Sequence, residues 1–446
     1  MKSAFLYPLV LFGLLSSPAG FGQSADYEDT AAKLQGTYIW QKKPAFNAAY
    51  SGQNSLSTDK EISYTATITA FLGFRPWAGG EFYFNPEVTQ GVPFSSLTGT
   101  GGFTNGEVTR TAGTNPQAYR QRAFLRQTWN HGGGTEKVES DLNQMAGTVD
   151  KNRFVLTVGN FSTLDVFDDN AYAHDPRRQF MNWAHMTSVA YDYAADARGY
   201  GWGFAAEWFA GDWALRLGRM TGPMQPNMLP TDFKIFKHYG DQVEVEHNHE
   251  IQGLPGSVKL LAWRNRAVMA RFQDALAYGN SVNWVPDPEY GKQYLFKVRN
   301  GEQIKYGFGV NTDQALTADL GVFFKAMWSD GQTETLAFTE VDRSMTAGVS
   351  LKGAAWGRAQ DTVGLAVARN ELSRERRAYL EAGGISFFIG DGALRYRPET
   401  SFEGYYSWNA MKGLWLTADY QRIHNPAYNA DRGPVNVWSA RLHSEF

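Results

Sequence analysis

A dense group of charged and aromatic side chains stands between residues 162 and 200 of this chain. Its members are Asp168, Asp169, Tyr172, His174, Asp175, Arg177, Arg178 and Trp183. Arginine and carboxylate groups bind hydroxyl groups through charge-assisted hydrogen bonds, and aromatic rings cover apolar C–H faces. These residue types therefore suit the binding of a polar molecule that carries many hydroxyl groups.

A second set of polar side chains recurs at every other position, which places them on one face if the chain is a β-strand. This set comprises Tyr83, Asn85, Glu87, Arg122 and Arg126. The intervening segment 89–121 adds Arg110 and Arg120. We expect the two strand faces and the segments 89–121 and 162–200 to meet around one binding region.

Cysteine and the common catalytic motifs are absent from the sequence. The chain has 0 cysteines, which excludes thiolate nucleophiles, disulfides and cysteine zinc sites. It contains neither a His-Glu-x-x-His zinc motif, nor a phosphate-binding loop of the Walker type, nor a Gly-x-Ser-x-Gly nucleophile elbow. We therefore expect no catalytic residue, no metal ion and no cofactor.

The charge balance argues against a nucleic-acid partner. The 446 residues include 42 Lys and Arg against 45 Asp and Glu, a formal net charge of −3. A nucleic-acid-binding protein needs a basic face to displace the counterions of the phosphates.

Alternation of apolar and polar residues runs through most of the chain and predicts β-strands of about ten residues. In 343–353, for example, Met345, Ala347, Val349 and Leu351 alternate with polar or small residues. Soluble sandwiches also alternate, but their strands are shorter. Long alternating strands with aromatic residues at their ends are typical of a transmembrane β-barrel, whose strands are apolar toward lipid and polar toward the lumen.

The pattern predicts an all-β protein, a transmembrane antiparallel β-barrel of 16 strands. The expected strands are 34–41, 62–74, 81–88, 122–129, 153–161, 201–210, 213–220, 239–249, 256–265, 302–313, 320–328, 343–353, 361–370, 401–410, 414–423 and 434–446. Segment 385–390 would be a seventeenth strand, but single-chain bacterial barrels have even strand numbers. We therefore place 385–390 in an extracellular loop, after a short helix at 373–381. We expect the long extracellular loops to fold toward the pore.

The ends of the chain carry export and assembly signals. Residues 1–25 have a basic start, a short apolar core and small residues, which predicts a signal peptide cleaved after Gly22 or Ala25. Residues 26–446 then form a single barrel domain. The last strand ends on Phe446, which resembles the signal read by the barrel-assembly machinery of bacterial outer-membrane proteins.

Several stretches resemble the OprB family of carbohydrate-selective porins, in order along nearly the whole chain. They include 79–87, 124–128, 156–161, Asp-Asp-Asn-Ala-Tyr-Ala-His-Asp-Pro-Arg (168–177), 191–196, 211–213, 319–323, 361–366 and Asn-Pro-Ala-Tyr-Asn-Ala-Asp-Arg-Gly-Pro-Val (425–435). The resemblance implies a sixteen-stranded barrel among the lipids of the bacterial outer membrane that passes small carbohydrates into the periplasm.

Two alternative functions stay open at this point. A general or anion-selective porin would have a lumen dominated by one sign of charge. An outer-membrane barrel enzyme would need serine, histidine and a third polar group at one height on the lipid face, and we find no strand that presents such a set. Both a monomer and a homotrimer are compatible with the sequence.

Overall fold

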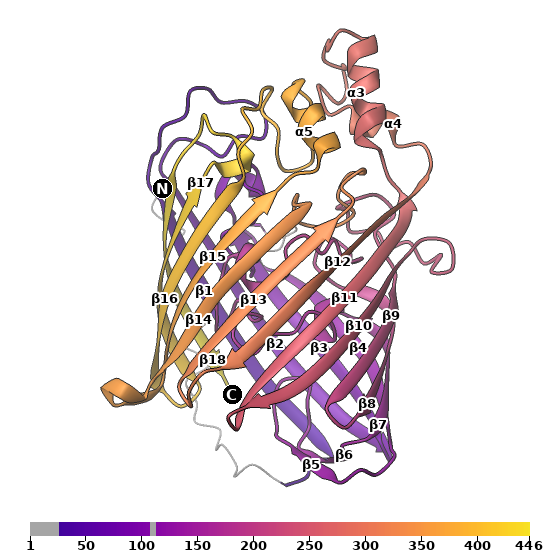
Figure 1. Ribbon diagram of the computed structural model, residues 1–446, viewed down its shortest axis with the longest axis vertical. Helices are drawn as coiled ribbons and strands as arrows, with labels where there is room; N and C mark the ends of the chain where they lie inside the picture. Colours follow the sequence, from indigo (N-terminus) through magenta and orange to yellow (C-terminus); the bar gives the residue numbers. More distant parts are fainter. Residues whose placement is uncertain (1–25, 108–112) are drawn as a thin grey trace.

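A computed structural model describes residues 26–107 and 113–446. Sixteen antiparallel strands form a closed barrel (Figure 1). They are β1 (Thr30–Lys43), β2 (Glu61–Trp77), β3 (Gly80–Val92), β4 (Gln117–Asn130), β7 (Arg153–Phe161), β8 (Gly201–Ala210), β9 (Trp213–Met220), β10 (Tyr239–Ile251), β11 (Leu254–Val268), β12 (Glu302–Ala315), β13 (Leu320–Ser329), β14 (Arg343–Gly353), β15 (Arg358–Glu371), β16 (Glu399–Met411), β17 (Leu414–His424) and β18 (Val435–Glu445). The expected signal peptide and Arg110 lie outside the described residues.

The first and last strands close the barrel. β1 pairs with β18 in antiparallel register, with Tyr38 opposite Leu442. The Phe446 amide donates to the Leu34 carbonyl at 2.8 Å, and the Leu34 amide donates back to the Phe446 carbonyl at 2.9 Å. Closure leaves no unpaired strand edge in the wall, which a lipid environment requires because nothing there replaces a missing backbone hydrogen bond.

Alternating side chains separate the lipid face of the wall from the lumen. On β11, Leu260 is 59% exposed whereas its neighbour Leu261 is 4% exposed. On β12, Phe308 points outward and Lys305 is buried inside. The outer face is apolar because it contacts lipid, and the inner face carries most of the charge.

The predicted strand count is confirmed, and so is the position of the segment that was left out of the wall. Residues 385–390 are irregular and follow the helix α5 (Arg374–Glu381), whose N-cap Ser373 accepts a hydrogen bond from the Arg376 amide. One connection was not predicted. Residues 131–152, between β4 and β7, form the hairpin β5 (Thr135–Val138) and β6 (Gly147–Asp150), a sheet separate from the barrel. The hairpin was not predicted because each of its strands has only four residues, too few to show the alternation that identified the ten-residue strands.

Apart from 131–152, which lies at the end with the short turns, the long and short connections lie at opposite ends of the barrel (Figure 1). The long connections carry α5 together with α3 (Phe272–Ser281) and α4 (Leu295–Val298). The other end carries tight turns such as 211–212 and 252–253. Long loops face the cell exterior in outer-membrane barrels, so the turns mark the periplasmic end. Among the described residues, no helix is both long and apolar enough to cross a membrane.

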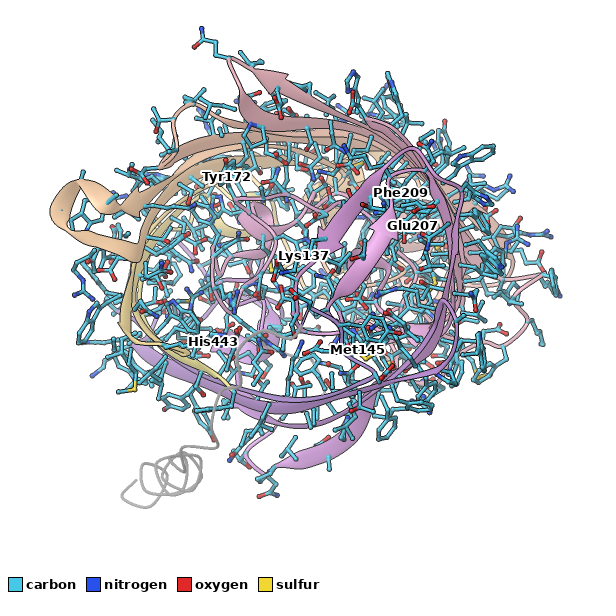
Figure 2. All side chains as sticks on the ribbon, turned by 90° about the horizontal axis from the view of Figure 1, so that it is seen from below. Lys137, Met145, Tyr172, Glu207, Phe209 and His443 are labelled. Carbon is cyan, nitrogen blue, oxygen red and sulfur yellow. The ribbon has the colours of Figure 1, made fainter. Side chains whose placement is uncertain are left out.

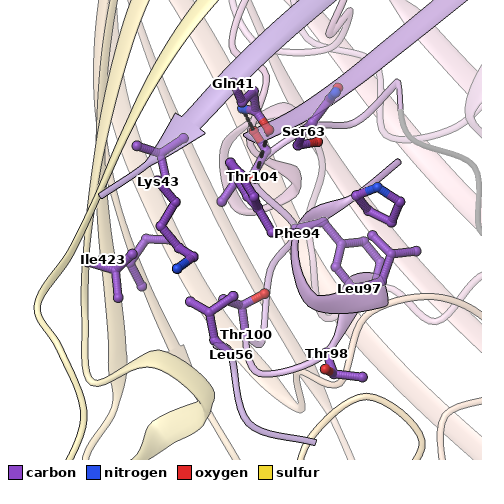
Figure 3. Close-up of a pocket in the computed structure, with 15 residues that line it drawn as sticks. Gln41, Lys43, Leu56, Ser63, Phe94, Leu97, Thr98, Thr100, Thr104 and Ile423 are labelled. Atoms are coloured by element: carbon purple, nitrogen blue, oxygen red, sulfur yellow. Dashed lines mark hydrogen bonds between the residues drawn. The ribbon is translucent and has the colours of Figure 1, made fainter. Parts of the chain in front are cut away.

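Two extracellular loops fold back into the barrel, as expected. In loop 93–116, residues 93–107 pack on the inner wall of β1. There the Gln41 side-chain amide donates to the Thr104 carbonyl at 3.0 Å, and the Thr104 hydroxyl donates to Gln41 at 3.0 Å (Figure 3). Phe94 and Leu97 of this loop are buried beside Leu56 and Ile423. Loop 162–200, which includes the short helix α2 (Trp183–Met186), is buried over most of its length.

Candidate functional site

Two carboxylates on the barrel wall hold the inward-folded loops by accepting hydrogen bonds from the backbone amides of the loops. Glu403 on β16 accepts hydrogen bonds from the amides of Met181 at 2.5 Å and Asn182 at 3.0 Å. Glu399, four residues earlier on the same face of β16, accepts from the amides of Gly101 at 2.8 Å and Gly102 at 3.1 Å. Charged acceptors make stronger hydrogen bonds than neutral ones, so each glutamate fixes one loop inside the lumen.

Glu87 on β3 and Arg177 in loop 162–200 form the centre of a polar network. Arg177 donates to Glu87 at 3.0 Å and to Glu107 of loop 93–116. Glu87 also accepts from Thr69 at 2.5 Å, from Gln121 at 2.5 Å and from Tyr119. Burial lowers the pKa of the Arg177 guanidinium, but the two carboxylates raise it more, so its pKa lies well above the usual value. Arg177 is therefore always charged and joins both loops to the wall.

Arg122 on β4 is also fully engaged. Its guanidinium makes a two-pronged contact with Asp165, at 2.7 Å and 2.6 Å. A third donor reaches Gln121 at 2.5 Å, and the group lies 5.2 Å above the Tyr200 ring. Asp165 also caps the turn that starts loop 162–200 by accepting from the Ser162 amide at 2.9 Å. The pair therefore fixes the point where the loop leaves the wall.

Arg126, on the same face of β4, is less engaged. It donates one hydrogen bond, to the Asn143 carbonyl at 3.1 Å. The nearest carboxylate oxygen, on Glu81, lies 3.8 Å away. Its guanidinium lies against the neighbouring rings of Tyr83 and Phe124, at 5.5 Å and 5.4 Å from their centroids. Arg126 therefore keeps donors for a ligand, whereas Arg122 and Arg177 serve mainly to position the loops.

These groups surround a cavity of about 490 Å³ inside the barrel. Eight of the expected residues line it: Glu87, Arg122, Arg126, His174, Asp175, Arg177, Arg178 and Trp183. Its charged lining consists of five arginines (Arg122, Arg126, Arg177, Arg178 and Arg198) and five carboxylates (Glu87, Glu107, Asp141, Asp165 and Asp175). Neither sign of charge dominates this lining.

An aromatic group forms part of the same wall. The Trp183 ring stacks on Phe338 at 5.2 Å, with an angle of 20° between the ring planes. Its indole N–H is buried and donates to no described residue. A buried donor without an acceptor is costly, and no described residue offsets that cost here.

Four expected residues face inward or lie in the loop but do not line this cavity. Tyr83 donates to Glu81 at 3.0 Å and accepts from the Met145 amide at 3.1 Å, so it is covered by segment 131–152. Asn85 is buried in the wall. Asp168 accepts hydrogen bonds from Ser188 of loop 162–200 and from Asn311 on β12. Asp169 is exposed near His174. Asp168 therefore stabilises the loop itself.

Arg120 and Tyr172 lie elsewhere. Arg120 was expected in loop 89–121, but it belongs to β4 and points out of the barrel, over the Trp202 ring at 4.9 Å. A bulge opposite Pro86 turns it outward, since Asn85 pairs with Arg122 and Pro86 pairs with Arg120. Tyr172 lines a second cavity of about 510 Å³ at the periplasmic turns, together with Arg178 and Trp415.

The sequence analysis did not name several residues that line the cavity, among them Glu107, Asp165, Arg198 and residues 141–144. Asp165 stands three residues after Ser162, the spacing of a capping box, and this signal was available. Glu107 and residues 141–144 carry no local signal, because their place depends on how distant segments pack.

The closed barrel with a charged lumen and inward-folded loops defines a porin of the bacterial outer membrane. A family model described as carbohydrate-selective porin, OprB family, matches residues 54–446. The chain therefore belongs to the OprB family of carbohydrate-selective porins, and it provides passive diffusion of small sugars across the outer membrane.

Solved structures agree with this fold. A high-pH structure of Pseudomonas putida OprB aligns with a TM-score of 0.70 at 15% identity and covers 94% of each chain. The outer-membrane channel DcaP of Acinetobacter baumannii aligns with a TM-score of 0.50 at 10% identity, covering 96% of this chain and 100% of that one. No curated protein matches the chain by sequence.

Proposed function

We propose that sugars are selected in the 490 Å³ cavity, where Arg126, Trp183 and the surrounding carboxylates replace the water around a sugar. The observation that carries this proposal is the balanced lining of five arginines and five carboxylates. A balanced set offers donors and acceptors to the hydroxyl groups of a neutral solute without attracting one kind of ion. Trp183 adds an apolar ring for the C–H face of the sugar.

An anion-selective or general porin is the competing proposal. The five lining arginines would support it if they acted alone. Three of them, Arg122, Arg177 and Arg178, are paired with carboxylates at 2.6–3.0 Å, so their field in the lumen is largely cancelled. This pairing favours a neutral solute over an anion.

We also propose that the channel has no hydrolytic activity. The group that comes nearest to a catalytic triad is Ser401, whose Oγ lies 3.1 Å from His185 Nε2, with Glu403 at 4.0 Å from the same nitrogen. In a working triad the acid binds the other ring nitrogen. All three side chains are fully buried and therefore out of reach of a substrate.

We also propose two partners for the outer surface of the barrel. The apolar outer face, including Leu260 and Phe308, suits contact with outer-membrane lipids. Phe446 directly follows the closing strand and 40% of its surface is exposed, which suits recognition by the barrel-assembly machinery.

The test of sugar selection is single-channel current in a planar bilayer, with glucose or a disaccharide added as a blocker. Arg126→Ala should raise the sugar concentration for half block by about tenfold or less, because water competes for each hydrogen bond. Arg126→Lys should restore the charge but not the planar donor pair, so ion selectivity should recover better than sugar block. Arg120→Ala is the matched control, since Arg120 lies on the same strand but points outward.

Two results would contradict these proposals. If sugar blocks the Arg126→Ala channel at the same concentration as the unmodified channel, the selecting groups lie elsewhere in the lumen. A strong preference for anions in a salt gradient, without any sugar block, would favour the general or anion-selective porin.

A further inference from the structure

Segment 131–152 enters the lumen from the periplasmic side. The other periplasmic connections are short, such as 211–212 and 252–253, whereas this one carries the hairpin of β5 and β6. Figure 2, seen from the periplasmic end, shows Lys137 near the middle of the barrel opening and Met145 inside the ring of strands. Residues 139–146, which we call the periplasmic strap, connect the two strands of this hairpin.

The periplasmic strap is fixed at its C-terminal end. Arg75 on β2 donates to the carbonyls of Ala146 at 3.0 Å and Met145 at 3.3 Å. The Glu28 carboxylate accepts from the Ala146 amide at 2.7 Å. Met145 is 1% exposed, and its amide donates to the Tyr83 hydroxyl at 3.1 Å. A loop with so many buried backbone partners holds a defined position.

Its middle is fixed as well, from the strand next to β2. Lys33 on β1 donates to the carbonyls of Asp141 and Gln144, the latter at 3.1 Å. The stretch between these anchors lines the main cavity through residues 141–144. The periplasmic strap is therefore one wall of the space through which the sugar passes.

Asn143 is the residue of the periplasmic strap that faces this space with unused groups. Its backbone is left-handed, with φ of 53°, and its carbonyl accepts from Arg126 at 3.1 Å. Its side-chain Oδ1 is buried and accepts no hydrogen bond from any described residue. An asparagine in a strained backbone with an unsatisfied buried oxygen is a feature that ligand binding explains.

We propose that Asn143 and Arg126 form a carbohydrate-binding subsite at the periplasmic side of the cavity. Arg126 donates to one hydroxyl group of the sugar. The Asn143 side chain, which is partly exposed, turns toward the cavity so that Oδ1 accepts from a neighbouring hydroxyl group. The contact between the Arg126 guanidinium and the Asn143 carbonyl keeps donor and acceptor side by side. This inference rests on the proposed selection of sugars in the cavity, and it adds a residue of the periplasmic strap to the groups that bind them.

The experiment is sugar block of single-channel current with glucose and a disaccharide present on both sides of the bilayer. Asn143→Gly removes the amide while tolerating the left-handed backbone. It should raise the sugar concentration for half block by about threefold to tenfold, as expected for one lost hydrogen bond. Asn143→Asp keeps an acceptor and also tolerates positive φ, so sugar block should be largely retained. Lys151→Ala, at an exposed position next to β6 and outside the cavity lining, is the control and should leave block unchanged.

The outcomes separate this subsite from the proposed function. If the unmodified channel shows no sugar block, the proposed function fails and the subsite fails with it. If the unmodified channel is blocked and Asn143→Gly is blocked at the same concentration, the subsite is wrong while sugar selection stands. A loss of block in Asn143→Asp equal to that in Asn143→Gly would also overturn the role of the acceptor.

Discussion

Arg122 on β4 and Asp165 at the start of loop 162–200 form a two-pronged ion pair, with distances of 2.7 Å and 2.6 Å between their nitrogen and oxygen atoms. The pair joins a wall strand to the loop that carries most of the charged residues in the lumen. Because Asp165 also caps the first turn of that loop, one contact sets both its place and its local shape.

The first prediction concerns this pair. Arg122→Ala should release the start of loop 162–200 and increase the noise of the open-channel current. Arg122→Lys should restore only part of the effect, because an ammonium group lacks the planar fork. In a double-mutant cycle with Asp165→Asn, urea unfolding should give a coupling of about 1–3 kcal/mol. A coupling near zero would mean that the pair does not hold the loop.

The second prediction concerns Glu403, which binds the amides of Met181 and Asn182. Glu403→Gln replaces one acceptor oxygen by an NH₂ group, so one buried amide loses its partner at a cost of about 1–3 kcal/mol. We expect a larger single-channel conductance, because the loop is released from the wall, and a lower temperature for loss of the heat-modifiable form. Glu371→Gln is the control, because Glu371 pairs with Arg369 on the outer surface and holds none of the described loops. Equal conductance in both variants would show that Glu403 does not anchor the loop.

The third prediction concerns the last residue. Phe446→Ala keeps both backbone hydrogen bonds to Leu34 and removes only the exposed ring. If the ring is read during assembly, the amount of folded, heat-modifiable protein in the outer membrane should fall while the purified variant keeps its stability. Trp438→Ala, on the same exposed face of β18, serves as the control. Normal yield of Phe446→Ala would contradict the terminal signal.

The fourth prediction concerns orientation and uses the absence of cysteine from the chain. Ala382→Cys, in the exposed turn after α5, should react with a membrane-impermeant maleimide in intact cells. Ala355→Cys, in the exposed turn between β14 and β15, should react only after the outer membrane is opened. Ser386 is unsuitable for labelling because it is 2% exposed within the loop. Reaction of Ala355→Cys alone in intact cells would reverse the assigned direction of the barrel.

Much of the fold could be predicted because its signal is local. Each barrel strand alternates on its own, as Met345 and Ala347 do against Ser344 and Thr346, since one face meets lipid and the other the lumen. The even strand number then placed 385–390 outside the wall. The inward folding of the two loops was predicted from their charge, but the carboxylates that hold them, Glu399 and Glu403, were not.

Arg120 and Arg126 show where the sequence stops being sufficient. Both stand at even positions on β4, and strict alternation would turn both into the lumen. Pro86 lacks an amide hydrogen, so the pairing of β3 with β4 slips there, and the bulge turns Arg120 outward onto Trp202. The sequence by itself determined the barrel, its strand number and the pool of charged residues, because alternation is a property of neighbouring residues. Only the tertiary structure decided which charges meet, since Arg177, Glu87 and Glu107 come from three distant segments whose contacts exist only after the loops pack inside the wall.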